Sequence, residues 1–277
     1  MFLKNVLPRF VRPFARRQYL KAHLTLRGQI PYAGQKVFCP SGSIIFDRIS
    51  RTGTYEPEIV DVLVALAKPN TTLFDVGANI GVLSSAVLAR RSDIRIVAFE
   101  CSPATLPYLR RTHESSTHKD RWEIMEVAAA DQDGVLDFYT FGAEQGAYDG
   151  LSSTGRGGTS IKVSVTARRL DAVWEDLKRP EVSLLKIDIE GGESAAMKGA
   201  AALIEVCRPY IVFEWNTINL CAYGVAADQI FSLVPSGYEL YSLPFLTEVK
   251  RSLLTLELSR TEMFLLAPQS LGRGEEE

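Results

Sequence analysis

The chain has 277 residues, is 46% apolar and 23% charged, and carries a formal net charge of −2. This length and composition predict a soluble enzyme with one α/β domain, and they leave little chain for a second domain. The charge balance argues against nucleic-acid binding, and no apolar run approaches the roughly 20 residues that span a bilayer. The four cysteines are scattered without a C-x-x-C pair, which favours a reducing, cytoplasmic location over a zinc site or a disulfide framework.

The N-terminal arm, residues 1–34, differs from the rest of the chain in charge. Seven Lys and Arg residues lie among apolar ones in residues 1–28, and the first acid is Asp47. Such an arm can make a peripheral contact with an anionic membrane, or pack on the following domain or on a second subunit of a homodimer. Pro8 and Pro13 should interrupt any long helix there. Polar residues after Arg16-Arg17 argue against an export signal.

Alternating periods predict an α/β order of elements along the domain, residues 35–268. Short strands or a hairpin are expected over residues 35–50, and a helix from Pro57 to Ala67. Further strands are expected at 72–76, 94–99, 122–127, 182–187, 210–214, 239–242 and 263–267, with helices at 82–89, 103–112, 170–177 and 193–204. Residues 269–277 are expected to form a disordered polar tail.

The richest motif joins the strand at 72–76 to the next helix through a glycine turn. It reads Asp75-x-Gly77-x-Asn79-x-Gly81, and its small residues let backbone N–H groups approach a ligand closely. A nicotinamide site would require G-x-G-x-x-G, and a carboxylate here would repel a pyrophosphate. S-adenosylmethionine is cationic and carries no phosphate, so the loop favours that cofactor. An ordinary strand-to-helix turn is the alternative.

A second acid, Glu100, ends the next strand, 25 residues after Asp75. In a βαβ unit this interval is one helix plus one strand, so both acids should stand at the carboxyl ends of neighbouring parallel strands. A carboxylate at that position can accept hydrogen bonds from both hydroxyls of a ribose. Glu100 therefore supports an adenosine-containing ligand.

The segment Lys186-Ile187-Asp188-Ile189-Glu190 is the candidate centre of catalysis. Alternation along a strand places Lys186, Asp188 and Glu190 on one side, and an apolar strand carries charges inward only when they are paired or used. Asp188 or Glu190 could take the proton of a hydroxyl group, with Glu214 as a further acid in the same cleft. Carboxylates could also hold a divalent metal, but an ion pair of Lys186 with Asp188 is favoured, and no metal site is assigned.

A β-rich excursion at residues 135–141 and 161–165 flanks a glycine-rich loop at residues 142–160. Loops of this length are often lids or binding loops, although a merely flexible insertion fits equally well. Tyr148 and Ser153 are candidates for contact with a polyhydroxylated substrate.

Together these segments resemble the FkbM family of S-adenosylmethionine-dependent methyltransferases. The resemblance covers residues 45–267 and depends on DVGANIG at 75–81, FECSP at 99–103, AAAD at 128–131, LKIDIEGGE at 185–193 and FEWN at 213–216. It implies a Rossmann-like class I fold, with a seven-stranded, mostly parallel sheet and helices on both faces. It also implies that Asp75, Gly77, Asn79 and Gly81 line the methionine end of the cofactor, Glu100 the ribose and Asp131 the adenine, with Tyr55 and Glu56 closing over the pocket.

The resulting hypothesis is an O-methyltransferase that acts on a hydroxyl of a small molecule or carbohydrate. The acceptor class follows from the resemblance alone. An NAD-type oxidoreductase and a non-catalytic cofactor-binding module remain as alternatives.

Overall fold

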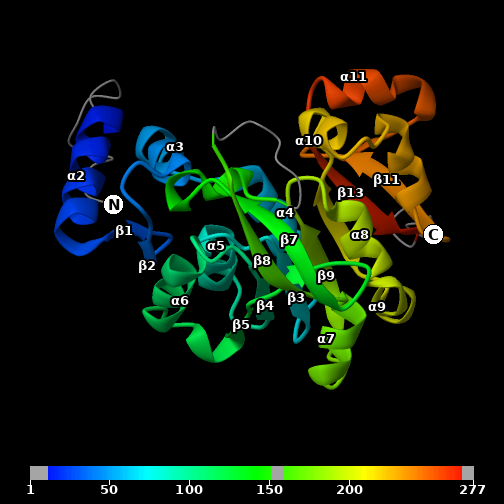
Figure 1. Cartoon of the computed structure of the whole chain (residues 1–277), viewed down its shortest axis with the longest axis horizontal. Helices are drawn as coiled ribbons and strands as arrows, with labels where there is room; N and C mark the ends of the chain where they lie inside the picture. Colours follow the sequence, from blue (N-terminus) through cyan, green and yellow to red (C-terminus); the bar gives the residue numbers. More distant parts are fainter. Residues whose placement is uncertain (1–11, 151–158, 270–277) are drawn as a thin grey trace, which may run out of the picture.

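We describe a computed structural model of the chain, in which residues 12–150 and 159–269 are defined. An eight-stranded sheet forms its centre (Figure 1), in the order β12-β11-β13-β10-β9-β3-β4-β5. The parallel strands are β10 (Tyr210–Glu214), β9 (Val182–Ile187), β3 (Thr72–Val76), β4 (Arg95–Phe99) and β5 (Trp122–Met125). The antiparallel strands are β13 (Met263–Pro268), β11 (Tyr238–Ser242) and β12 (Thr247–Glu248).

This arrangement is the predicted Rossmann-like class I fold. The described sheet has one strand more than the seven expected, because the chain turns back after β11 and adds the two-residue strand β12 at the edge. Strands β3, β9 and β10 begin and end close to where the sequence predicted them, since each is a short apolar run that is buried on both faces.

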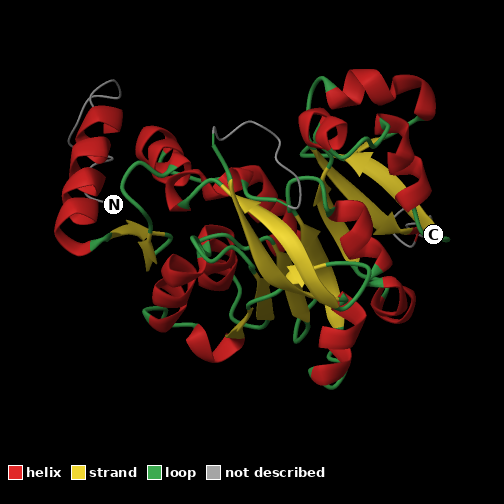
Figure 2. Ribbon diagram, viewed as in Figure 1, coloured by secondary structure: helices red, strands yellow, loops and turns green. Residues whose placement is uncertain are grey.

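Helices cover both faces of the sheet (Figure 2) and enclose two apolar cores. Successive residues of β3 point to opposite faces, so Leu73 packs in one core and Phe74 in the other. One core includes α4 (Pro57–Leu66), α5 (Val82–Arg90) and α6 (Leu106–Glu114); the other includes α7 (Leu170–Asp176), α8 (Glu193–Lys198) and α9 (Ala201–Cys207).

The remaining elements lie around this centre. The hairpin of β1 (Gln29–Tyr32) and β2 (Gln35–Phe38) crosses the boundary that the sequence suggested between residues 34 and 35. The excursion forms a separate three-stranded sheet of β6 (Ala128–Ala129), β8 (Ile161–Arg168) and β7 (Gly134–Thr140). Short helices complete the fold: η1 (Lys119–Arg121), η2 (Ala143–Tyr148), α10 (Thr217–Ala222), η3 (Ala227–Leu233), η4 (Arg251–Leu253) and α11 (Leu254–Leu258).

Two of the predicted elements were wrong. Residues 44–50, expected as strand, belong to helix α3 (Ile44–Thr52), which begins where the Ser43 hydroxyl accepts a hydrogen bond from the Phe46 N–H. Its buried residues Ile45, Phe46 and Ile49 have the spacing of a helical face. The helix expected over 193–204 is divided at Gly199, where an added Cβ would lie 2.0 Å from the Ala130 carbonyl oxygen.

The described part of the N-terminal arm is a helix, α2 (Arg12–Arg27), that packs on the domain. Leu20 and Leu24 are buried in the first core, and Arg17 pairs with Asp47 of α3 at 3.3 Å. Pro13 does not interrupt the helix, because it lies in the first turn, where proline is tolerated. Among the helices that the structure describes, none combines the length and apolar content needed to cross a membrane.

Candidate functional site

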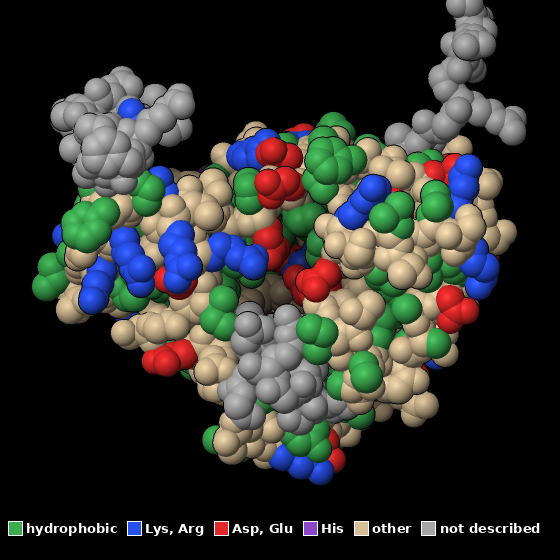
Figure 3. Space-filling model, turned by 90° about the horizontal axis from the view of Figure 1, so that it is seen from above, with side chains coloured by type: hydrophobic (Ala, Val, Ile, Leu, Met, Phe, Trp, Pro, Cys, Tyr) green, Lys and Arg blue, Asp and Glu red, His purple; other side chains and the backbone are tan. Residues whose placement is uncertain are grey.

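A cavity of about 230 Å³ opens at the carboxyl ends of the parallel strands. Acidic side chains gather around a recess on this face of the molecule (Figure 3). The lining includes two basic side chains, Arg48 and Lys186, and seven acidic ones: Glu56, Glu100, Asp149, Asp188, Glu190, Glu214 and Glu262. The cavity is therefore an environment that favours cations over anions.

The glycine turn after β3 is fixed by contacts with the end of β9. Gly77 has a left-handed φ of +79°, and a Cβ at this position would lie 1.9 Å from the Asp188 carbonyl oxygen. Gly77 and Asn79 line the cavity, as expected for a cofactor loop. Gly81 does not line it, because the space for its side chain is occupied by the Trp122 ring. The absence of a Cβ at Gly81 therefore serves packing rather than ligand approach.

Asp75 lies behind the loop and does not reach the cavity. Its side chain is fully buried, and one carboxylate oxygen accepts a hydrogen bond of 2.5 Å from the Ser84 hydroxyl. The other oxygen is 3.4 Å from the Lys186 ammonium, which stands beside it in register on β9. The sequence suggested that Asp75 could receive a cationic ligand, whereas in the structure the cation is Lys186.

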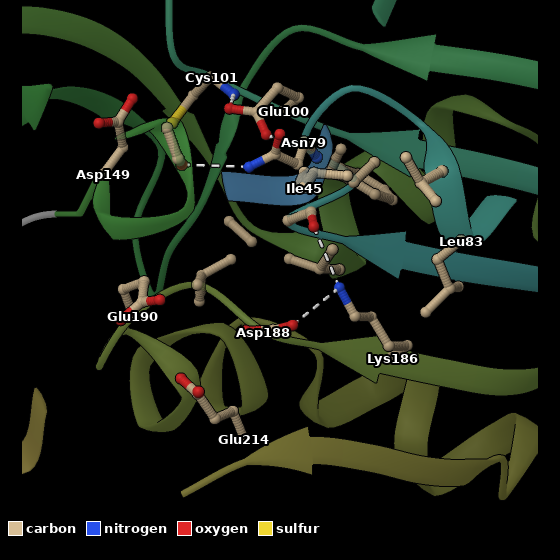
Figure 4. A pocket seen from close by; sticks show the side chains of 18 of the residues that line it. Ile45, Asn79, Leu83, Glu100, Cys101, Asp149, Lys186, Asp188, Glu190 and Glu214 are labelled. Atoms are coloured by element: carbon tan, nitrogen blue, oxygen red, sulfur yellow. Dashed lines mark hydrogen bonds and ion pairs between the residues drawn. The ribbon is translucent and has the colours of Figure 1, made fainter. Parts of the chain in front are cut away.

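Lys186 connects three parts of the site (Figure 4). Its ammonium donates a hydrogen bond of 3.0 Å to the Gly77 carbonyl and pairs at 3.4 Å with the Asp188 carboxylate. Burial alone would lower the pKa of Lys186, but the nearby carboxylates of Asp188, Asp75 and Glu56 outweigh it and raise that pKa. The ammonium is thus held in its charged form, and the favoured ion pair of Lys186 with Asp188 is present.

Glu100 caps the turn that faces the cavity. One of its oxygens accepts the Asn79 N–H at 2.9 Å, and the other accepts the N–H groups of Cys101 and Ser102 at 2.9 and 2.7 Å. Burial raises the pKa of this carboxyl to about 7, against the opposing effect of these donors. The two carboxylate oxygens have four lone pairs, of which three accept these N–H groups, so Glu100 keeps capacity to accept one ribose hydroxyl.

Glu190 and Glu214 are brought together by a residue that the sequence gave no reason to single out. The Asn219 amide, buried on α10, donates to Glu190 at 2.6 Å and to Glu214 at 3.1 Å. Burial, followed by the charges of Asp188 and Glu190, raises the pKa of Glu214 well above its usual range. Glu214 therefore retains its proton more readily than an exposed carboxyl.

The Glu193 side chain stabilises the turn that carries Asp188 and Glu190. One oxygen of this buried carboxyl accepts the N–H groups of Ile189 and Gly191 at 3.2 and 3.1 Å. Glu190 has a left-handed φ of +56°, so simple strand alternation does not continue beyond Ile187. Asp188 and Glu190 nevertheless both line the cavity with Lys186.

The glycine-rich excursion contributes Asp149 to the cavity. Its carboxylate accepts hydrogen bonds from the hydroxyls of Ser102 and Thr140 at 2.6 and 2.9 Å, and from the Phe141 N–H. The Asn79 amide donates to the Gly146 carbonyl at 3.1 Å, so residues 142–150 are attached directly to the glycine turn. Ser153 lies outside the described residues.

The other predicted residues are placed as follows. Tyr55 and Glu56 line the cavity as expected, and Glu56 pairs with Arg48 at 3.3 Å. Tyr148 ends η2. Asp131 is exposed in the turn after β6 and is not among the residues that line this cavity, so its predicted contact with adenine has no counterpart in the described geometry.

Sequence reasoning missed Arg48, Asn219 and Glu262 as parts of the site. They come from α3, α10 and the residue before β13, and no motif around them gave a signal. Within residues 12–150 and 159–269, no group of three or more His, Cys, Asp or Glu side chains has an arrangement that could hold a metal ion.

Comparison with known proteins identifies relatives of the chain. Residues 75–235 match the sequence profile of the methyltransferase FkbM domain. The 2-O-methyltransferase NoeI of Sinorhizobium fredii (strain NBRC 101917 / NGR234) is 25% identical over 187 residues, which are 63% of this chain and 75% of NoeI.

Solved structures of methyltransferases are also similar, at low sequence identity. The methyltransferase FkbM from Methylobacillus flagellatus KT aligns with 93% of this chain at 15% identity and a TM-score of 0.44, and the chain spans 59% of that protein. A TehB-like SAM-dependent methyltransferase from Corynebacterium glutamicum ATCC 13032 Kitasato aligns with 80% of this chain and 91% of its own, at 10% identity and a TM-score of 0.43.

Replacing Gly77 by alanine tests the close contact between the glycine turn and Asp188. Gly34 is a matched control, because its φ of +76° is similar and no atom lies within 4 Å of an added Cβ. We expect Gly34→Ala to cost about 1 kcal/mol of unfolding free energy, from backbone strain alone. Gly77→Ala should cost about 3 kcal/mol or more, because the clash adds to the strain. Equal losses in urea denaturation would contradict the contact.

The raised pKa of the buried Glu193 carboxyl predicts that the stability of the fold depends on pH. Burial raises its pKa to about 7 in the folded protein, above the usual 4.5, so the folded state binds this proton more tightly than the unfolded state. Its contribution to stability is therefore largest below pH 4.5 and falls as the pH rises through 7. Between pH 4.5 and 7.5 the unfolding free energy of the wild type should fall by on the order of 3 kcal/mol relative to that of Glu193→Gln. Exposed Glu123→Gln is the control, and a constant difference for Glu193→Gln would refute the shift.

Proposed function

Because the chain belongs to the FkbM methyltransferase family, we propose that it is an S-adenosylmethionine-dependent O-methyltransferase that acts on a hydroxyl of a small molecule or sugar. The observation that carries this proposal is the ion-paired Asp188 carboxylate in the acidic cavity, in backbone contact with the glycine turn. The name of the S. fredii relative, a 2-O-methyltransferase, supports a hydroxyl as the acceptor.

The cavity fits a cationic methyl donor better than a dinucleotide. Gly77 and Asn79 supply the close backbone, and Glu100 supplies an acceptor for a ribose hydroxyl. The carboxylates around the cavity would repel a pyrophosphate, and the turn lacks the glycine spacing that binds one. When bound, S-adenosylmethionine supplies an electrophilic methyl group on a positively charged sulfur.

Side chains of the protein would accept the proton and orient the acceptor. Asp188 can accept the proton of the acceptor hydroxyl as the new C–O bond forms, so that the oxygen attacks with alkoxide character. Lys186 holds that carboxylate in place from β9. Glu190 and Glu214, joined by Asn219, offer further acceptors to the hydroxyls of a sugar. Orientation of the hydroxyl by these groups supplies part of the rate enhancement.

Calorimetric titration with S-adenosylhomocysteine tests the cofactor site, with NAD as the competing ligand. We expect S-adenosylhomocysteine to bind and NAD not to bind. Glu100→Gln should weaken the binding roughly tenfold or more, because a charge-assisted hydrogen bond to the ribose is lost. The exposed residue Glu123, changed to glutamine, is the control. Binding of NAD alone would overturn the proposal in favour of an oxidoreductase.

Asp188→Asn tests the proposed base. We expect it to lower the rate of methyl transfer to hydroxylated acceptors by roughly 10²- to 10⁴-fold. Affinity for S-adenosylhomocysteine should change only a few-fold, because asparagine has the same shape. The exposed residue Asp120, changed to asparagine, should behave as wild type. A protein that binds S-adenosylhomocysteine but transfers methyl to none of a panel of sugar and small-molecule hydroxyls would be a non-catalytic module.

A further inference from the structure

Helix α2 presents two different faces. Leu20 and Leu24 are 4% and 9% exposed and pack in the core, whereas Phe14 and Leu26 are 66% and 80% exposed. Positions 14, 18, 22 and 26 follow one another at intervals of four residues, so they lie along one side of the helix. Tyr19, 49% exposed, is beside this line. The outward side of α2 therefore carries large apolar side chains towards both of its ends, with a glutamine and an alanine between them, and this apolar stripe lies opposite the side that is anchored in the domain.

Basic residues border this stripe on both edges. By helical position Lys21 lies on one edge, and Arg12 and Arg27 lie on the other. Arg16 and Arg17 are bound to the domain, through the Arg51 carbonyl and the Asp47 carboxylate. No acidic residue occurs before Asp47. Figure 3 shows a row of basic side chains that begins on the side of the molecule where α2 lies in Figure 1 and continues towards the central recess. This positive charge is local, because the whole chain has a net charge of −2.

We propose that the outer face of α2 binds the surface of an anionic phospholipid bilayer. An interfacial helix buries an apolar stripe at the level of the headgroups, and the long stems of Lys and Arg at its edges let their charges reach the lipid phosphates. Leu20 and Leu24 remain in the core, so α2 can bind without leaving the domain. A second copy of the chain fits this face less well, because a two-fold interface would place the same basic edges against each other.

Vesicle cosedimentation of the full chain tests this proposal without reference to methyl transfer. We expect binding to vesicles of phosphatidylcholine with about one third phosphatidylglycerol, and little binding to phosphatidylcholine alone. Lys21→Gln with Arg27→Gln should lower the partition coefficient roughly 30-fold, from the loss of two charges near the surface. Phe14→Ser with Leu26→Ser should lower it at least roughly tenfold, from the loss of buried apolar area.

The matched control is Lys198→Gln with Lys250→Gln, which removes the same charge from exposed positions outside α2. This variant should bind nearly as wild type does, and thermal melts of all variants should coincide because every substituted side chain is exposed. Absence of binding, equal binding to both kinds of vesicle, or wild-type binding by both α2 variants would overturn the proposal. So would a dimer in sedimentation equilibrium that Phe14→Ser with Leu26→Ser dissociates, because the face would then belong to a second copy.

Discussion

The buried ammonium of Lys186 is the interaction on which the rest of the site depends. It lies between two carboxylates, Asp75 and Asp188, and also binds the Gly77 carbonyl. Removing one partner of a buried pair typically costs about 3–5 kcal/mol, because an uncompensated charge remains. Here two carboxylates, one within β3 and one directly after β9, would lose their partner together. The same ion therefore stabilises the core and holds the carboxylate of Asp188, the proposed base.

The carboxyl groups around the cavity lie in different electrostatic environments. Asp188 faces an ammonium, whereas burial and neighbouring carboxylates raise the pKa of Glu214, and burial raises that of Glu100 to about 7. A cation that entered this cavity would lower those pKa values and be stabilised in return. An anion that entered would raise those pKa values and be destabilised in return. The charge distribution thus selects a class of ligand before any individual hydrogen bond is considered.

The sequence predicted those parts of the fold that local pattern determines. The strands that meet at the site are short apolar runs, and Asp188 and Glu100 follow from their positions at strand ends. The break at Gly199 and the amide of Asn219 were not predictable, because each depends on contacts between distant segments. Helix α3 was missed although its signals are local, namely the Ser43 cap and the helical spacing of its buried residues. Asp75 shows the limit most clearly: its motif was recognised, but its partner is a lysine 111 positions later on a neighbouring strand.

The contacts between the ends of β3 and β9 also set the proposed base apart from the rest of the cavity wall. The Gly77 backbone lies against the Asp188 carbonyl, and the Gly77 carbonyl accepts a hydrogen bond from the Lys186 ammonium. The glycine turn and Asp188, the proposed base, are therefore held against each other. Methyl transfer depends on alignment that a displacement of about 1 Å can disrupt, and such contacts preserve it. The rest of the cavity wall comes from α3, the excursion around Asp149 and the residue before β13. These segments lie outside the contact between Gly77 and Asp188, so we expect them to shape the space for the acceptor.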